Sequence, residues 1–221
     1  NLAAYALFVD QPQIEVQAKR IAQLGYNLMR LHHHDSTRWV SPTVIDKAKP
    51  DSRSFDAAAL DRLDYWIHCL KREGVYVWLD LHVGRVLKEG DVTNPFGTIL
   101  GWDEIAKRGA EVKGFCYYND NLRALMQEFS AQYVSRTNPY TGLAYKDEPA
   151  IMGMLITNEN DLTHHFGNLM LGDKGNPYHN GLFEADVKAF AQRTGLPAAE
   201  VGRTWVAGPS KIYLNDRERG F

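Results

Sequence analysis

Residues 74–82 read Gly-Val-Tyr-Val-Trp-Leu-Asp-Leu-His, a glycine followed by an apolar run that ends in polar side chains. Residues 25–32, Gly-Tyr-Asn-Leu-Met-Arg-Leu-His, repeat this phrase. A third apolar run at residues 151–155 leads into Ile-Thr-Asn-Glu-Asn at 156–160. Strands that are nearly continuously apolar are typical of parallel sheets buried on both faces. We therefore expect three parallel strands that all turn polar at their carboxyl ends.

Segments with helical periodicity precede each of these strands. Residues 12–24 repeat apolar side chains at helical spacing, and Asp56 can cap a second helix that stops before Gly74. A third helix is expected over residues 119–135. Three weaker signals complete the pattern: the end of a first strand within residues 1–9, a helix over 182–194, and another helix that begins at 209.

The connections differ in length at the two ends of the strands. Those from helix to strand are tight, at Gly25 and Gly74, whereas about 20 residues follow His32 and over 30 follow His82 before the next helix. Long loops at the carboxyl ends of strands are typical of a TIM-type (β/α)8 barrel, whose site lies at that end. A doubly wound sheet is the alternative, but no glycine-rich phosphate loop follows any strand.

The number of strands limits this assignment. A complete barrel has eight strands in about 250 residues, and this sequence offers three, or four if residues 1–9 contribute one. We therefore expect residues 1–221 to form one domain, an incomplete α/β barrel that represents about the first half of the (β/α)8 fold. The remainder of the barrel would then be needed as a partner.

Composition excludes several classes of partner. The formal net charge is -2 and the pI is near 6.5, so no electrostatic footprint for nucleic acid or an anionic membrane is present. No apolar run approaches the roughly 18 residues that span a bilayer. Cys69 and Cys116 match no zinc-site spacing, so we interpret them as structural. We expect neither a metal nor a cofactor.

The pair Asn158-Glu159 closes the third strand. Hydrolysis of a glycosidic bond usually takes two carboxyl groups, one to protonate the leaving oxygen and one to attack or to activate water. Glu159 stands where a barrel strand meets the rim, which makes it the candidate catalytic acid/base. Asn158 can hold a sugar hydroxyl. A lone Asn-Glu is more often a cap or a surface charge, and the two other polar strand ends are what favour a functional site here.

The other two strand ends supply candidate substrate-binding residues. A buried arginine must be paired, so Arg30 predicts a carboxylate across the barrel. His82 could bond the same carboxylate or a sugar hydroxyl. His32 lies on the same side of its strand as Arg30 and is expected to line the sugar site. A satisfied structural histidine is the alternative interpretation of His82.

A metal site is the sharpest competing hypothesis. The run His32-His33-His34-Asp35 could centre a metal-dependent TIM-barrel hydrolase that uses His32, His34 and Asp35. Adjacent side chains alternate sides on a strand, so only His32 and His34 could converge easily. The one further histidine pair, His164-His165, falls in an expected loop. We therefore favour sugar chemistry over metal chemistry.

At these residues the chain resembles the glycoside hydrolase clan A barrels, particularly family 5 cellulase-like and mannanase-like enzymes. The resemblance rests on residues 25–32, on residues 74–82 and on Asn158-Glu159, and it covers roughly residues 12–160. In that family the second strand ends in an arginine of the site, the third in a histidine and the fourth in Asn-Glu. The resemblance implies Glu159 as the general acid/base and Asn158 as the partner of the sugar 2-hydroxyl, with Arg30 and His82 in support.

The family's nucleophile is a second glutamate at the end of the seventh strand, and no segment of this chain can be that strand. We therefore expect a retaining glycoside hydrolase for a β-linked poly- or oligosaccharide, with the second carboxylate outside this chain and the chain alone inactive. A non-catalytic sugar-binding barrel is a further alternative. Enzymes of this resemblance are commonly secreted, so a secreted or periplasmic location is an expectation, although no signal peptide is visible.

Overall fold

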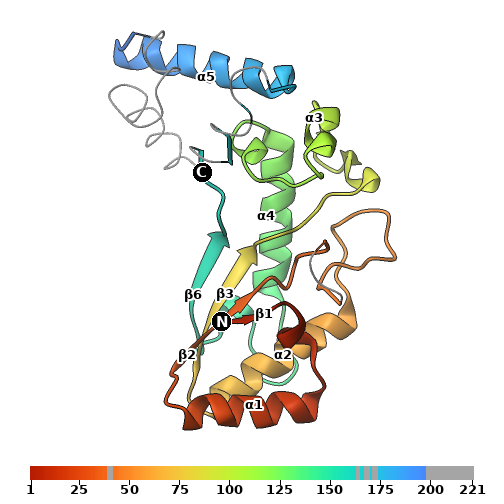
Figure 1. Cartoon of the computed structure of the whole chain (residues 1–221), viewed down its shortest axis with the longest axis vertical. Helices are drawn as coiled ribbons and strands as arrows, with labels where there is room; N and C mark the ends of the chain where they lie inside the picture. The colour runs from red at the N-terminus through yellow and green to blue at the C-terminus, as the bar shows by residue number, and fades with distance from the viewer. Residues whose placement is uncertain (39–41, 163–164, 167–169, 171–173, 198–221) are drawn as a thin grey trace. The chain divides into compact units, whose positions relative to one another are not determined.

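The computed structural model covers residues 1–221 and describes residues 1–38, 42–162, 165, 166, 170 and 174–197 (Figure 1). The chain divides into two compact units. The first comprises Asn1–Asp91 and Leu125–Asn158, and the second comprises Val92–Ala124 and Glu159–Phe221. No helix in the described part of the chain has the length and apolar character needed to cross a membrane. The helix expected from residue 209, and His164, lie outside the described residues.

The first unit is built on one parallel four-stranded sheet in the order β1-β2-β3-β6. The strands are β1 (Leu2–Ala3), β2 (Leu28–His32), β3 (Tyr76–His82) and β6 (Ile151–Thr157). The short β1 confirms that a first strand ends near the amino terminus, since Leu2 pairs with Leu31. Arg30 pairs with Trp78, and Asp80 pairs with Leu155, so the carboxyl ends of β2, β3 and β6 lie at one edge of the sheet.

A helix follows each of the first three strands along the chain. They are α1 (Gln11–Gln23) after β1, α2 (Ala57–Arg72) after β2 and α4 (Asp120–Ser135) after β3, and α4 begins in the second unit and ends in the first. The Asp56 carboxylate accepts the Ala59 N–H at 2.8 Å, which caps α2 as expected. Gly74 ends the same segment at a φ of 74°, a left-handed conformation that glycine adopts without strain.

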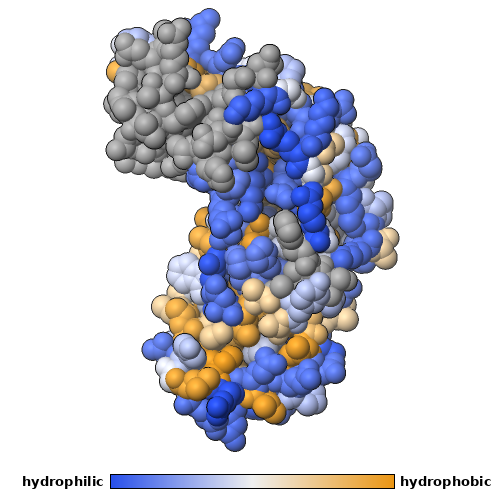
Figure 2. Space-filling model, in the orientation of Figure 1, coloured by the Kyte–Doolittle hydropathy of each residue, from blue (hydrophilic) through white to orange (hydrophobic). Residues whose placement is uncertain are grey.

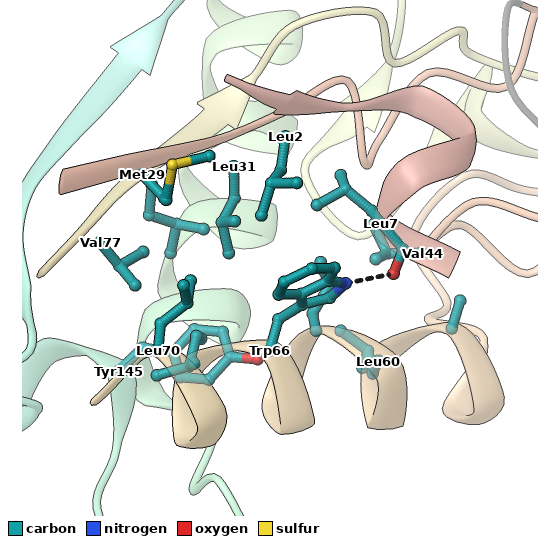
Figure 3. Packing of buried hydrophobic residues seen from close by; sticks show 14 of the residues in the cluster. Leu2, Leu7, Met29, Leu31, Val44, Leu60, Trp66, Leu70, Val77 and Tyr145 are labelled. Carbon is teal, nitrogen blue, oxygen red and sulfur yellow. Dashed lines mark hydrogen bonds between the residues drawn. The ribbon is translucent and has the colours of Figure 1, made fainter. Parts of the chain in front are cut away.

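The core of the first unit lies between the sheet and its helices. Alternate strand residues, such as Leu31 and Val77, point toward α2, where Trp66 and Leu70 are fully buried (Figure 3). Figure 3 also shows the Trp66 indole N–H donating to the Leu7 carbonyl at 3.0 Å, which satisfies the polar atom of a buried tryptophan. One face of the sheet is therefore covered by packed helices.

The opposite face of the sheet is open, which differs from the expectation of strands buried on both faces. Leu28 is 39% exposed and its register partner Tyr76 is 52% exposed. Both residues lie on the side of their strands that alternates with the core side. In a closed barrel this side would face the interior, and here the four strands of the sheet leave it uncovered.

Long loops follow the carboxyl ends of β2 and β3, and they are tied to one another. Asp35 accepts the backbone N–H groups of Val83 at 2.8 Å and Gly84 at 3.1 Å. A Cβ atom on Gly84 would lie 2.3 Å from the Ser36 hydroxyl, so only glycine allows this approach. Short 3-10 turns occur in the connections of the first unit: η1 (Ala4–Phe8) after β1, η2 (Glu89–Asp91) after β3 and η4 (Tyr145–Asp147) before β6.

The second unit contains the hairpin of β4 (Thr93–Asn94) and β5 (Gly97–Thr98), then α3 (Trp102–Lys107), η3 (Phe115–Tyr117) and α5 (Pro177–Thr194). Helix α5 begins five residues before the expected start at 182. Pro177 occupies its first turn, and Glu104 accepts the backbone N–H groups of Tyr178 and His179. The cap comes from a helix that is distant in sequence, so local periodicity does not indicate it. The sequence pattern therefore predicts too late a start for α5.

Candidate functional site at the carboxyl ends of the strands

Asp80 of β3 is the centre of a polar cluster on the open side of the sheet. Its Oδ2 atom accepts the Arg30 Nε–H at 2.8 Å and forms an ion pair with Arg30 Nη2 at 2.7 Å. The same oxygen contacts the Nδ1 atom of His32. The Asp80 side chain is fully buried, whereas the Arg30 side chain is 30% exposed. A buried carboxylate is tolerated here because the Arg30 guanidinium and the His32 ring both contact its Oδ2 atom.

Arg30 also reaches β6. Its Nη2 atom donates to the Oδ1 atom of Asn158 at 2.7 Å, and the Asn158 backbone N–H donates to the His82 carbonyl at 2.8 Å. The structure therefore brings Arg30, His32 and Asn158 together from three adjacent strand ends. The predicted carboxylate partner of Arg30 exists, but its position was predicted wrongly: Asp80 is on the neighbouring strand, not across the barrel.

A pocket of about 450 Å³ opens beside this cluster, lined by Asn1, Leu28, Arg30, Trp78, Leu155 and Asn158. Trp78 forms its apolar wall, and the ring packs directly over Gly153 of β6. A Cβ atom at Gly153 would lie 2.7 Å from Cζ3 of Trp78, so the ring can occupy this place only because position 153 is glycine. Polar donors beside an aromatic wall suit a sugar, which presents hydroxyls at its rim and C–H groups on its faces.

Glu159 follows Asn158 in the chain and is exposed. Its φ is 50°, a left-handed conformation that is uncommon for residues other than glycine. The next residue, Asn160, is buried in the second unit, where its Oδ1 accepts the Gly114 N–H at 2.8 Å and its carbonyl accepts the Tyr117 hydroxyl at 2.5 Å. Glu159 is thus a constrained residue between two anchored asparagines, although its own carboxyl group is exposed.

His82 is not part of the cluster. Its ring is buried against α4, where Nε2 lies 3.1 Å from the Met126 carbonyl and 3.0 Å from the Ser130 hydroxyl, and the ring packs on Phe129. Burial, followed by the nearby charge of Arg85, lowers the pKa of His82 to about 4. The neutral ring therefore donates from Nε2 to the helix. This placement differs from the expectation that His82 would bond the carboxylate partner of Arg30.

The three residues of the alternative metal site point to different partners. His34 is buried, with Nε2 at the Asp80 carbonyl oxygen and its ring stacked on Tyr133. Burial lowers the pKa of His34. The Asp35 carboxylate accepts two backbone N–H groups, and the His32 ring contacts the Asp80 carboxylate. Within the described residues no group of three potential ligands could hold a metal ion, and the structure does not support this alternative.

Asp80 is the residue of the cluster that the sequence analysis does not single out. It was visible in the run Leu-Asp-Leu-His, where a carboxylate interrupts an apolar strand two positions before its end. A charged residue inside a buried strand needs a partner, and Arg30 in the preceding strand needs one as well. Pairing the two would have placed the carboxylate correctly.

Comparisons with known proteins agree with this fold. The endo-1,4-beta-mannanase from Rhizomucor miehei matches 87% of this chain with a TM-score of 0.54 and 19% identity. The chain has the fold of part of that mannanase. It spans about half of the mannanase, 51% of its length, and the expected incomplete barrel-type α/β fold is confirmed.

Two further structures are similar at lower scores. The glycoside hydrolase family 5 mannosidase from Rhizomucor miehei matches 73% of this chain and 42% of its own, with 19% identity and a TM-score of 0.48. The hyperthermostable endo-1,4-beta-D-mannanase from Thermotoga petrophila matches 86% of this chain and 50% of its own, with 15% identity and a TM-score of 0.46. No protein-family model and no curated protein matches the sequence.

Proposed function

We propose that this chain is the first half of the catalytic barrel of a retaining glycoside hydrolase that acts on a β-linked poly- or oligosaccharide. The observation that supports this most is the hydrogen bond from Arg30 to Asn158, in a pocket at the carboxyl ends of barrel strands, with Glu159 next in the chain. Active sites of (β/α)8 enzymes lie at this end of the strands. Both units would belong to the one domain.

In this proposal Glu159 is the general acid/base. It protonates the leaving glycosidic oxygen while a second carboxylate attacks the anomeric carbon, and it then takes a proton from the water that releases the glycosyl-enzyme. The second carboxylate would come from the half of the barrel that this chain does not span, about 5–5.5 Å from Glu159 as in other retaining enzymes. The mannanase fold makes β-1,4-mannan the first substrate to test.

The sugar would be held by the donors of the cluster. Asn158 has its carbonyl oxygen bound to Arg30, so its Nδ2 amino group is the part left to hydrogen-bond a sugar hydroxyl oxygen. Arg30 and His32 lie beside it, and Trp78 offers an apolar surface in the same pocket. Hydrogen bonds of this kind strengthen in the transition state of glycoside hydrolysis and supply several kcal/mol.

The test is the leaving-group dependence of a Glu159→Ala variant in the complete enzyme. We expect the variant to lose activity on mannan by about 10³-fold or more, because a poor leaving group needs protonation. Activated aryl glycosides need no acid to form the glycosyl-enzyme, so their loss should be far smaller. Glu184→Ala, which removes an exposed glutamate of α5, is the matched control and should leave both activities unchanged. Equal losses on the two substrates would refute the role of Glu159.

A further inference from the structure

Asp80 holds two potential substrate-binding residues through a single oxygen atom. Oδ2 accepts the Nε–H of Arg30, forms an ion pair with Arg30 Nη2 and contacts the Nδ1 atom of His32. The other oxygen, Oδ1, is buried without a partner among the described residues. The side chain is fully buried, so it does not itself reach the pocket. Its effect must therefore pass through the groups that it holds.

The contact with His32 determines which ring nitrogen carries the proton. Oδ2 accepts from the Arg30 guanidinium, and an oxygen that acts as the acceptor for one donor suits a second donor, so we assign the Nδ1 atom of His32 as the donor in this contact. In a histidine the hydrogen bond of one nitrogen sets the state of the other. Nδ1–H toward Asp80 leaves Nε2 as the nitrogen that can bond another group.

The contact with Arg30 orients the amide of Asn158 in the same way. The hydrogen bond from Nε and the ion pair at Nη2 fix the plane of the guanidinium against Asp80, and Nη2 donates in turn to the side-chain carbonyl oxygen of Asn158. Arginine can only donate, so the amide must turn its oxygen to Arg30 and its amino group away. The chain of contacts from Asp80 through Arg30 to Asn158 thus decides which atom of Asn158 is available.

We propose that Asp80 is a positioning residue that fixes the hydrogen-bonding direction of both His32 and Asn158. It leaves an acceptor or second donor at His32 Nε2 in the cluster beside the pocket, and it presents a donor pair at Asn158 Nδ2, on a residue that lines the pocket. The use of these groups on a sugar rests on the proposed function, whereas the proton position on His32 does not.

The direct test is nitrogen NMR of the chain with labelled histidine and arginine. In the wild-type chain we expect His32 to carry a proton on Nδ1 and Arg30 to show a slowly exchanging Nε–H. A His32 ring with its proton on Nε2 alone would overturn the proposal without any variant being needed.

Asp80→Ala should release Nδ1 of His32 and abolish slow exchange at Arg30 Nε–H. Asp64→Ala is the matched control, because Asp64 is another fully buried carboxylate that pairs with an arginine, Arg136, in the same unit. It should change the Arg136 signal and leave His32 as in the wild type. If both variants disturb His32 equally, the effect of Asp80 is only structural and the proposal fails.

Titration with mannohexaose separates this proposal from the proposed function. We expect Asp80→Ala to weaken binding about tenfold, as for loss of an oriented hydrogen bond, and Asp64→Ala to have no effect. Unchanged affinity in Asp80→Ala would contradict positioning of the sugar donors. Absence of binding by the wild-type chain would count against the proposed function, while the proton on His32 Nδ1 would still decide the role of Asp80.

Discussion

Asp80 and His82 lie two positions apart on β3, yet their side chains serve different parts of the molecule. Asp80 bonds Arg30 and His32 on the open side of the sheet. His82 turns toward α4, where its Nε2–H lies within hydrogen-bond distance of the Met126 carbonyl and the Ser130 hydroxyl oxygen. A buried polar ring takes the side where partners exist, because leaving it unsatisfied costs about 1–3 kcal/mol.

The buried state of His82 predicts a pH dependence of stability. Its pKa falls from 6.5 to about 4 on folding, so the unfolded chain binds a proton more readily than the folded chain between these values. The stability that the neutral ring contributes is present above pH 6.5 and is lost as the pH falls toward 4, by at most about 3 kcal/mol. We expect His82→Gln to reduce the slope of unfolding free energy against pH in this window.

Urea unfolding of both proteins at several pH values measures this difference. His34 also has a pKa lowered by burial and contributes a slope of the same sign, so the comparison between wild type and variant is the informative quantity. Above pH 7 the two slopes should coincide. If the unfolding free energies of variant and wild type differ by a constant amount between pH 4 and 6.5, His82 does not titrate as the structure indicates.

For individual residues, the sequence predicts that Arg30, His32 and Asn158 lie close together, but it does not predict the position of His82. Parallel strands that end in polar residues share one edge, and that rule needs only periodicity. The alternation of faces would place His82 on the side of Asp80. Which side a strand-terminal residue takes depends on partners from α4, a helix more than 40 residues away in sequence, and no local pattern reports them.

At the scale of elements, β6 fits beside β3 because Gly153 leaves room for the Trp78 ring. The register pairs these two residues, and a bulge in the pairing lies next to them, between Val77 and Trp78. Glycine inside a strand often marks such a close approach. The wall of the pocket and the pairing of the two strands therefore depend on the same residue.

Gly153→Ala should disturb both the pocket wall formed by Trp78 and the pairing of β3 with β6. The added Cβ would lie 2.7 Å from the Trp78 ring, so the ring must move, and we expect a loss of about 1–3 kcal/mol in the free energy of unfolding. Trp78→Leu combined with Gly153→Ala should recover part of that loss, because leucine is smaller than tryptophan and leaves room for the added Cβ atom. Additive effects of the two substitutions in a double-mutant cycle would contradict the contact.

The elements themselves were largely predictable. Gly25 and Gly74 mark the ends of α1 and α2, and the Asp56 cap lies where the sequence placed it. The start of α5 was not predictable, because Glu104 of α3 supplies its cap from 74 and 75 residues before the N–H groups that it accepts. Local signals define elements whose caps are local.

At the scale of the whole molecule, β6 is the edge strand of the sheet that the described residues form, and apolar side chains on it are exposed. Met152 is 57% exposed and Ile156 is 61% exposed. Apolar residues reach the surface in the lower part of Figure 2, where the first unit lies. An edge strand with unpaired backbone groups and exposed apolar side chains is a surface for further strand pairing. This agrees with a chain that spans about half of a barrel, and it supports the proposal that the remainder is needed for activity.

The central claim is that the ends of β2, β3 and β6 form a sugar-binding site. The most direct test is a titration of the nitrogen-labelled chain with mannohexaose, observed at the Arg30 Nε–H and the Asn158 side-chain amide, with polyethylene glycol as a control. If the strand ends bind a sugar, these two signals should shift saturably with mannohexaose alone. Shifts confined to other surfaces, or none up to the solubility limit of the oligosaccharide, would contradict it.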